Sequence, residues 1–107
     1  MGAVTSILYL EQNKYFKVKY LVADSPFYKL KETIAHFTRN KLGYNLFLIK
    51  LALNFIKSNI KEKTGYDIMK LNIKDSVPKI TIPVSLIASK NDEMVPYKHF
   101  ETIYELF

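Results

Sequence analysis

The fold follows from Val84-Ser-Leu-Ile-Ala-Ser-Lys-Asn-Asp-Glu-Met-Val-Pro96, in which an apolar run of strand type leads into a polar loop. The run is short and largely apolar on both faces, which is typical of a buried strand in a parallel sheet. A helical period begins directly after Pro96, so the stretch predicts a strand, a loop and a helix. Asp92 then lies just beyond the carboxyl end of the strand, where α/β sheets carry their chemistry.

A second apolar run, Lys17-Val-Lys-Tyr-Leu-Val-Ala23, leads into Asp24-Ser-Pro-Phe27 and predicts a buried strand that ends before Pro26. Helical periodicity predicts helices at 2–12, 29–40, 44–60 and 97–107. Two parallel strands joined by a long helical crossover indicate an α/β fold. Because a stable sheet needs three or more strands, we expect these 107 residues to be an internal piece of a larger domain.

Two of the predicted helices have patterns that indicate how they are covered. The helix at 44–60 is apolar nearly all round, so we expect other elements on both of its sides. It belongs to the segment 29–75, which we expect to fold over the carboxyl ends of the strands as a cap. The helix at 97–107 has an apolar face that is expected to point inward, made of Phe100, Ile103, Tyr104 and Phe107.

The composition excludes several classes of function. The net charge is +6, from 16 basic and 10 acidic residues, yet Arg39 is the one arginine. Nucleic-acid binders usually concentrate arginine for bidentate contacts, so we expect no nucleic-acid partner. The longest apolar run, 46–56, contains Lys50 and Asn54 and is shorter than the roughly 18–20 residues of a membrane span, so membrane association is not expected. The absence of cysteine and of a signal-peptide pattern favours a cytoplasmic location.

The first predicted helix opens with Met1-Gly-Ala-Val-Thr5, which fits two patterns. It is the second half of a nucleophile elbow, G-x-S-x-G, if a serine precedes Met1. The elbow uses small residues because its strand and helix approach closely, and the backbone N–H of Met1 would help to form an oxyanion hole. The same residues match the N-myristoylation pattern M-G-x-x-x-[ST] at Gly2, but Val4 and Ile7 are typical of a core helix.

Asp92 is the first candidate for chemistry. In a Ser-His-Asp triad such a carboxylate orients the histidine and stabilises its charged form, but Asp92 can also simply cap the loop. Asp24 ends the other strand and is a rival acid, although its Asp-Ser-Pro context suggests a turn. His99 is expected to cap or pack its helix, and His36, in the predicted cap, is expected to be exposed or adjacent to the substrate. A hydroxyl without an adjacent base is a poor nucleophile, which applies to Ser6, Ser25, Ser76 and Ser89.

Four segments in sequence order carry a resemblance to a known family. They are Met1-Gly-Ala-Val-Thr5, Leu21-Val-Ala-Asp-Ser-Pro-Phe27, Ile82-Pro-Val84, and Ser89-Lys-Asn-Asp92 followed by Val95-Pro96. Together they resemble the α/β-hydrolase superfamily over essentially the whole chain. The likeness is greatest to its serine-aminopeptidase or esterase/lipase-like branch, which includes the Bem-type hydrolases.

The resemblance implies a single partial α/β-hydrolase domain over 1–107, with parallel strands flanked by helices and a helical cap insertion. Its parts would be a post-elbow helix and strand at 1–27, the cap at 28–78, and an acid-bearing strand, loop and helix at 79–107. The family pattern assigns Asp92 as the triad acid and Met1 to the oxyanion hole. The nucleophilic serine and the catalytic histidine are then expected outside these residues, so the chain alone is expected to be inactive.

The function implied by this resemblance is acyl transfer. We expect a fragment of a serine hydrolase that acts on an ester, a thioester or an amide, without a cofactor or a metal ion. Phe27, Phe47 and Leu51 are expected to contact the substrate, and the apolar cap favours a small-molecule or lipid-like substrate with a hydrophobic acyl group. The alternative is a non-catalytic, hydrolase-like chain, either a binding module or a truncated gene product.

Overall fold

The computed structural model describes residues 1–13, 17–42 and 46–107. The elements in chain order are α1 (Gly2–Gln12), β1 (Leu21–Asp24), α2 (Leu30–Phe37), η1 (Thr38–Leu42), α3 (Leu46–Thr64), η2 (Ile68–Lys70), η3 (Val77–Lys79), β2 (Val84–Ile87) and α4 (Tyr97–Leu106). η1 is a π-helical turn that continues α2, while η2 and η3 are single 3₁₀ turns. Helices together with a parallel sheet confirm the predicted α/β class. β1 begins later than the strand predicted at 17–23, because residues 17–20 lie outside the ladder, and it includes Asp24.

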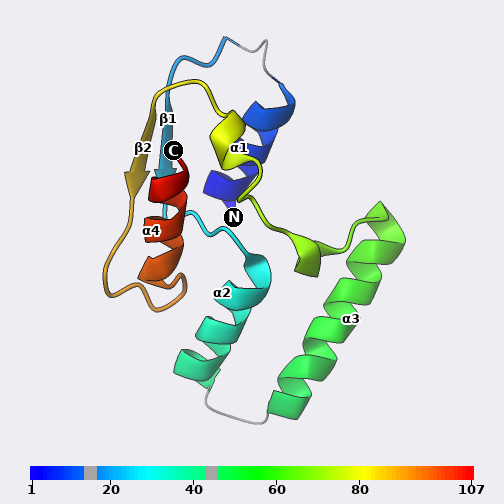
Figure 1. Cartoon of the computed structure of the whole chain (residues 1–107). Helices are drawn as coiled ribbons and strands as arrows, with labels where there is room; N and C mark the ends of the chain where they lie inside the picture. The colour runs from blue at the N-terminus through cyan, green and yellow to red at the C-terminus, as the bar shows by residue number, and fades with distance from the viewer. Residues whose placement is uncertain (14–16, 43–45) are drawn as a thin grey trace.

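β1 and β2 are adjacent and parallel, as the crossover predicted. Their register pairs Leu21 with Val84 and Asp24 with Ile87. The N–H of Ser25 extends the ladder by donating to the carbonyl of Ile87 at 2.8 Å. Both strands therefore end at one edge, and Figure 1 shows α2 and α3 beyond the two arrowheads.

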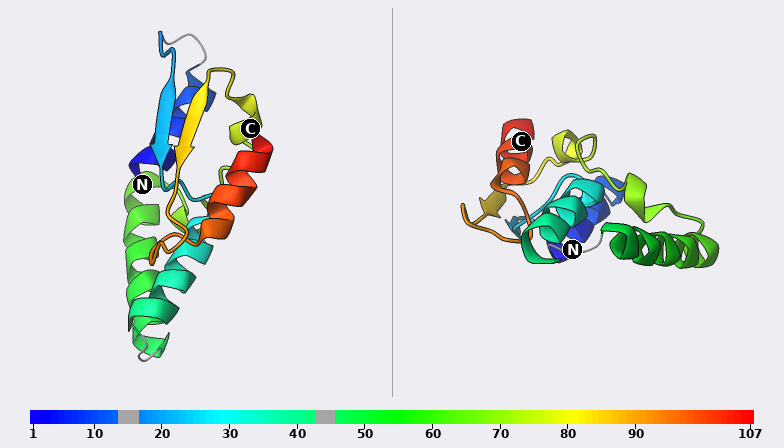
Figure 2. Two further views of the ribbon diagram at one scale, coloured as in Figure 1. Left: turned by 90° about the vertical axis from the view of Figure 1, so that its left-hand side faces the viewer. Right: turned by 90° about the horizontal axis from the view of Figure 1, so that it is seen from below.

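The hydrophobic core joins the helices beside the sheet to the short turns. Ile7 of α1, Val77 of η3 and Ile103 of α4 are each 0% exposed and belong to one cluster. Phe27 and Ile73 continue this cluster toward the carboxyl ends of the strands. Each such side chain contributes about 1.5–3 kcal/mol when it is fully buried. The core thereby fixes the start of α1 and the chain after β1 relative to each other, and Figure 2 shows this arrangement from two further sides.

The helical insertion between the strands is closed at its base. An antiparallel bridge pairs Lys29 with Asn72, and the N–H of Ile73 donates to the carbonyl of Tyr28 at 2.9 Å. α2 and α3 extend from this base past the carboxyl ends of β1 and β2 (Figure 1). The segment thus lies on the side of the sheet where a cap was expected.

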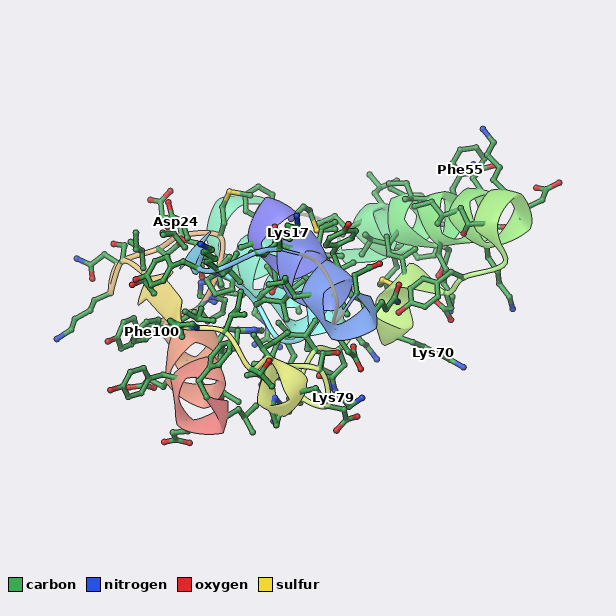
Figure 3. All side chains as sticks on the ribbon, turned by 90° about the horizontal axis from the view of Figure 1, so that it is seen from above. Lys17, Asp24, Phe55, Lys70, Lys79 and Phe100 are labelled. Atoms are coloured by element: carbon green, nitrogen blue, oxygen red, sulfur yellow. The ribbon has the colours of Figure 1, made fainter. Side chains whose placement is uncertain are left out.

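Two expectations about helix faces are wrong. α3 is uncovered on one side within the described residues, with Phe47 66% and Phe55 71% exposed, and Figure 3 shows Phe55 at the outer edge of the molecule. In α4, Ile103 is buried, but Tyr104 is 66% and Phe107 45% exposed. An apolar period identifies a helix but does not say how many neighbours cover it.

Candidate active site

A cavity of about 460 Å³ lies at the carboxyl edge of the sheet. Its walls come from the start of α1, the end of β1, α2 and the loop after β2, and the lining residues are Met1, Asp24, Ser25, Phe27, Leu30, Thr33, Ile34, Phe37, Asp92, Met94 and Val95. The volume is within the roughly 300–1,000 Å³ of small-molecule sites. The structure therefore brings together four residues that the sequence singled out, namely Met1, Asp24, Phe27 and Asp92.

Asp92 lines this cavity and also holds its own loop. Its Oδ1 accepts hydrogen bonds from the N–H groups of Met94 at 2.8 Å and Val95 at 2.9 Å. Desolvation is the largest influence on this carboxyl and acts to raise its pKa. The N–H groups of Val95 and Met94, the Ser25 hydroxyl and the nearby His36 together outweigh it and lower the pKa of Asp92. Asp92 is therefore a fixed, ionised carboxylate beside the cavity.

Ser25 is a site residue that the sequence reasoning did not select. It is the one non-glycine residue of the described chain with a positive φ, at 48°. Its Oγ donates to Asp24 Oδ1 at 3.1 Å, and Ser25 lines the same cavity as Asp24 and Asp92. A non-glycine residue in this region is strained by about 1–3 kcal/mol, and such strain gathers at functional sites. The feature of the sequence that could have indicated Ser25 is its position between the end of a predicted strand and Pro26.

Met1 caps the N-terminus of α1 and is 67% exposed at the cavity. Among the described residues, α1 has no side-chain cap hydrogen bond and no acidic residue in its first turn. The positive end of the helix dipole therefore faces the cavity without a compensating carboxylate of its own. A Cβ at Gly2 would meet no atom of the described structure within 4 Å, and the strand expected to approach this glycine would precede Met1, so the close packing of the elbow stays a prediction.

Phe47 and Leu51, which were expected to contact substrate, do not line this cavity. They lie on α3 with 66% and 51% of their surfaces exposed. The apolar wall is formed instead by α2, through Leu30, Ile34 and Phe37. These three residues form the apolar face of their helix in the sequence, but the pattern alone did not show that the face lines a cavity.

His99 serves in packing, as the sequence suggested. It is 2% exposed, and its Nδ1 accepts a hydrogen bond from the N–H of Tyr28 at 3.2 Å. The Tyr28 hydroxyl donates to Glu32 at 2.6 Å; this bond, followed by burial, raises the pKa of Tyr28 to about 12. His36 is half-buried on α2, where its Nε2 lies 2.9 Å from Asn40 Nδ2.

The described ranges 1–13, 17–42 and 46–107 contain no group of three or more His, Cys, Asp or Glu residues placed to hold a metal ion. Nor does any helix in these ranges have both the length and the apolar character needed to cross a membrane.

A comparison with known proteins found a bacterial relative of this chain. The chain is 32% identical over 108 aligned residues to the uncharacterized protein YqkD of Bacillus subtilis strain 168. The alignment covers 98% of this chain and 33% of YqkD, so the chain spans about a third of the length of this relative. No protein-family model matches the sequence, and no solved structure matches it.

Proposed function

We propose that this chain supplies the acid, an oxyanion-hole amide and the substrate-covering helices of a serine hydrolase of the α/β-hydrolase class. The observation that carries the proposal is that Met1 and Asp92 line one cavity at the carboxyl edge of a parallel sheet. In α/β sheets the ligand site lies at this edge. The reaction is acyl transfer from an ester, a thioester or an amide, in a cytoplasmic enzyme.

We assign Asp92, and not Asp24, as the triad acid because hydrogen bonds hold its carboxylate in place before the reaction. Two backbone N–H groups hold Oδ1, which leaves Oδ2 to accept the Nδ1–H of a catalytic histidine. A carboxylate in this position orients the imidazole and stabilises the imidazolium that forms as the serine loses its proton. Asp24 is held by the Ser25 hydroxyl, at 3.1 Å, and is less firmly positioned.

The backbone N–H of Met1 would donate to the oxyanion of the tetrahedral intermediate. The serine would immediately precede Met1, and the uncompensated dipole of α1 would stabilise the negative charge. Removal of one such donor typically costs about 10²–10³-fold in kcat. The cavity lining of Phe27, Leu30 and Phe37 suits a hydrophobic acyl group, since little of it can pair with charge.

The coding sequence on either side of these residues tests the proposal. We expect a Gly-x-Ser immediately before Met1 and a histidine after one further strand downstream. The protein encoded by that continuous frame is then incubated with a serine-directed fluorophosphonate. Covalent labelling that a mutation of the serine abolishes supports the hydrolase. A frame without the serine, or a folded protein that is not labelled, overturns the proposal and favours a non-catalytic, hydrolase-like chain.

A further inference from the structure

A second cavity, the α2–α3 groove, lies between α3 on one side and α2 with η1 on the other. It has a volume of about 350 Å³, and Ile34 of α2 lines both this groove and the candidate active site. The sequence predicts a hydrophobic acyl substrate for the cap, through Phe47 and Leu51, but neither residue lines this groove, and the proposed hydrolase chemistry assigns no ligand to it.

The floor of the α2–α3 groove is aliphatic. Ile34, Ile49, Leu53 and Met69 line it, and they come from α2, α3 and η2. The volume is at the lower end of the range for small-molecule sites, which suits one unbranched hydrocarbon chain. Burying methylene groups against this floor is favourable, and an inorganic anion bound by the polar residues of the groove would not gain that free energy.

The rim of the groove is cationic. Lys31, Arg39 and Lys50 contribute to its lining, and none of the described residues that line it carries a carboxylate. Within the described parts of the chain, none of these three side chains forms an ion pair, whereas Lys57 of α3 pairs with Asp67 at 3.2 Å. The positive charge at the groove is therefore available to a ligand, and the long aliphatic stems of the three residues can extend the apolar wall.

We propose that the α2–α3 groove binds a long-chain fatty acid. Its hydrocarbon chain lies along Ile49, Leu53 and Met69, and its carboxylate lies at the rim, where Arg39 can form a bidentate pair. Small polar anions should bind weakly because they cannot use the aliphatic floor. Neutral or cationic amphiphiles should bind weakly because they cannot pair with the positive charge of the rim. This binding does not depend on the proposed hydrolase activity, because the ligand is held and not turned over.

The methionines of the chain report the two cavities separately. Met69 lines the α2–α3 groove, while Met94 lines the candidate active site. In the protein encoded by the continuous reading frame, with ¹³C-labelled methionine methyl groups, titration with dodecanoate below its micelle-forming concentration should shift the Met69 methyl resonance saturably and leave that of Met94 in place. Dodecyltrimethylammonium, with the same chain and the opposite charge, should bind at least about tenfold more weakly, and added salt should weaken the binding of dodecanoate.

Two lysines of α3 provide a matched pair of variants. Lys50→Glu reverses a charge at the rim and should weaken dodecanoate binding at least about tenfold. Lys61→Glu makes the same change on the same helix away from the groove and should alter affinity by less than about twofold. The proposal is overturned by equal binding of the two amphiphiles, by the absence of a saturable Met69 shift, by a shift of Met94 in place of Met69, or by equal effects of the two variants.

Discussion

His99 of α4 accepts a hydrogen bond through Nδ1 from the backbone N–H of Tyr28 at 3.2 Å, and the two rings stack with their centroids 4.3 Å apart. The bond requires an unprotonated Nδ1. Burial is the main cause that lowers the pKa of His99; Glu32 opposes it, while His36, Lys98 and Lys74 lower it further. The contact that holds α4 against the base of the insertion therefore depends on a neutral histidine.

This contact predicts that the chain loses stability in mild acid. The unfolded chain takes up a proton on His99 near the ordinary pKa of 6.5, whereas the folded chain resists it until the pH reaches the lowered pKa. The free energy of unfolding should therefore fall as the pH drops below about 6.5 and level off below the folded pKa. Urea unfolding at about pH 7.5 and about pH 5.5 measures the difference.

Variants of the two histidines separate this effect from general acid sensitivity. His99→Phe leaves the Tyr28 N–H without its acceptor, which should destabilise the chain by about 1–3 kcal/mol and remove most of the pH dependence in this range. His36→Asn removes a minor cause of the lowered pKa of His99 and should retain most of that dependence, since burial of His99 is the main cause. If His99→Phe and the parent chain show the same change with pH, the linkage to His99 is wrong.

The backbone conformation of Ser25 predicts that this position tolerates glycine better than valine. Its φ of 48° is accessible to glycine without strain, so Ser25→Gly should change the free energy of unfolding by no more than about 1 kcal/mol even though the hydrogen bond to Asp24 is lost. Ser25→Val should destabilise by about 1–2 kcal/mol or more, because a β-branched side chain is poorly accommodated at positive φ. Thermal unfolding of both variants is the check. Equal stability of Ser25→Val and the parent would contradict the strained conformation.

The exposed side of α3 predicts that large apolar residues there contribute little to stability. Phe47→Ser and Phe55→Ser should each alter the free energy of unfolding by less than about 0.5 kcal/mol, since both side chains are largely exposed. Leu53→Ser, on the side facing the α2–α3 groove, should cost more than about 1 kcal/mol. Denaturant unfolding of the three variants distinguishes the two sides of the helix. Large losses for Phe47→Ser and Phe55→Ser would show that the exposed side is covered.

The periodicity of apolar residues and the order of the predicted elements were sufficient to predict the four α-helices and the pairing of β1 with β2. The helical spacing of apolar residues, together with Asn13 as the residue that ends the helix, identifies α1, which ends at Gln12. The long helical crossover indicates that the two strands it joins are parallel. The resemblance to the α/β-hydrolases, in place of pattern alone, predicted that Asp92 would lie near Met1, and the two residues line one cavity. Sequence patterns could not predict which helix faces are covered, because this depends on the elements that pack against them.

The inward orientation predicted for Tyr104, which is wrong, and the position of Phe47, which lies outside the cavity of Asp92, illustrate this limit. Each residue has the right chemistry and the right helical period, but exposure depends on which elements lie opposite. The positive φ of Ser25 was equally inaccessible from the sequence, since Ser25 adopts it between a tertiary hydrogen bond, from its N–H to Ile87, and Pro26.

The role of Asp92 is tested most directly by comparing two amide variants in the enzyme encoded by the continuous reading frame. Asp92→Asn keeps an oxygen that accepts from Met94 and Val95 but removes the charge, and Asp24→Asn is the matched control at the same cavity. With a p-nitrophenyl ester, Asp92→Asn should lower kcat by about 10⁴-fold, as expected when the acid of a triad is lost. Asp24→Asn should lower it by less than about tenfold. A loss of similar size in Asp24→Asn with near-normal turnover in Asp92→Asn would contradict the assignment of Asp92 as the catalytic acid.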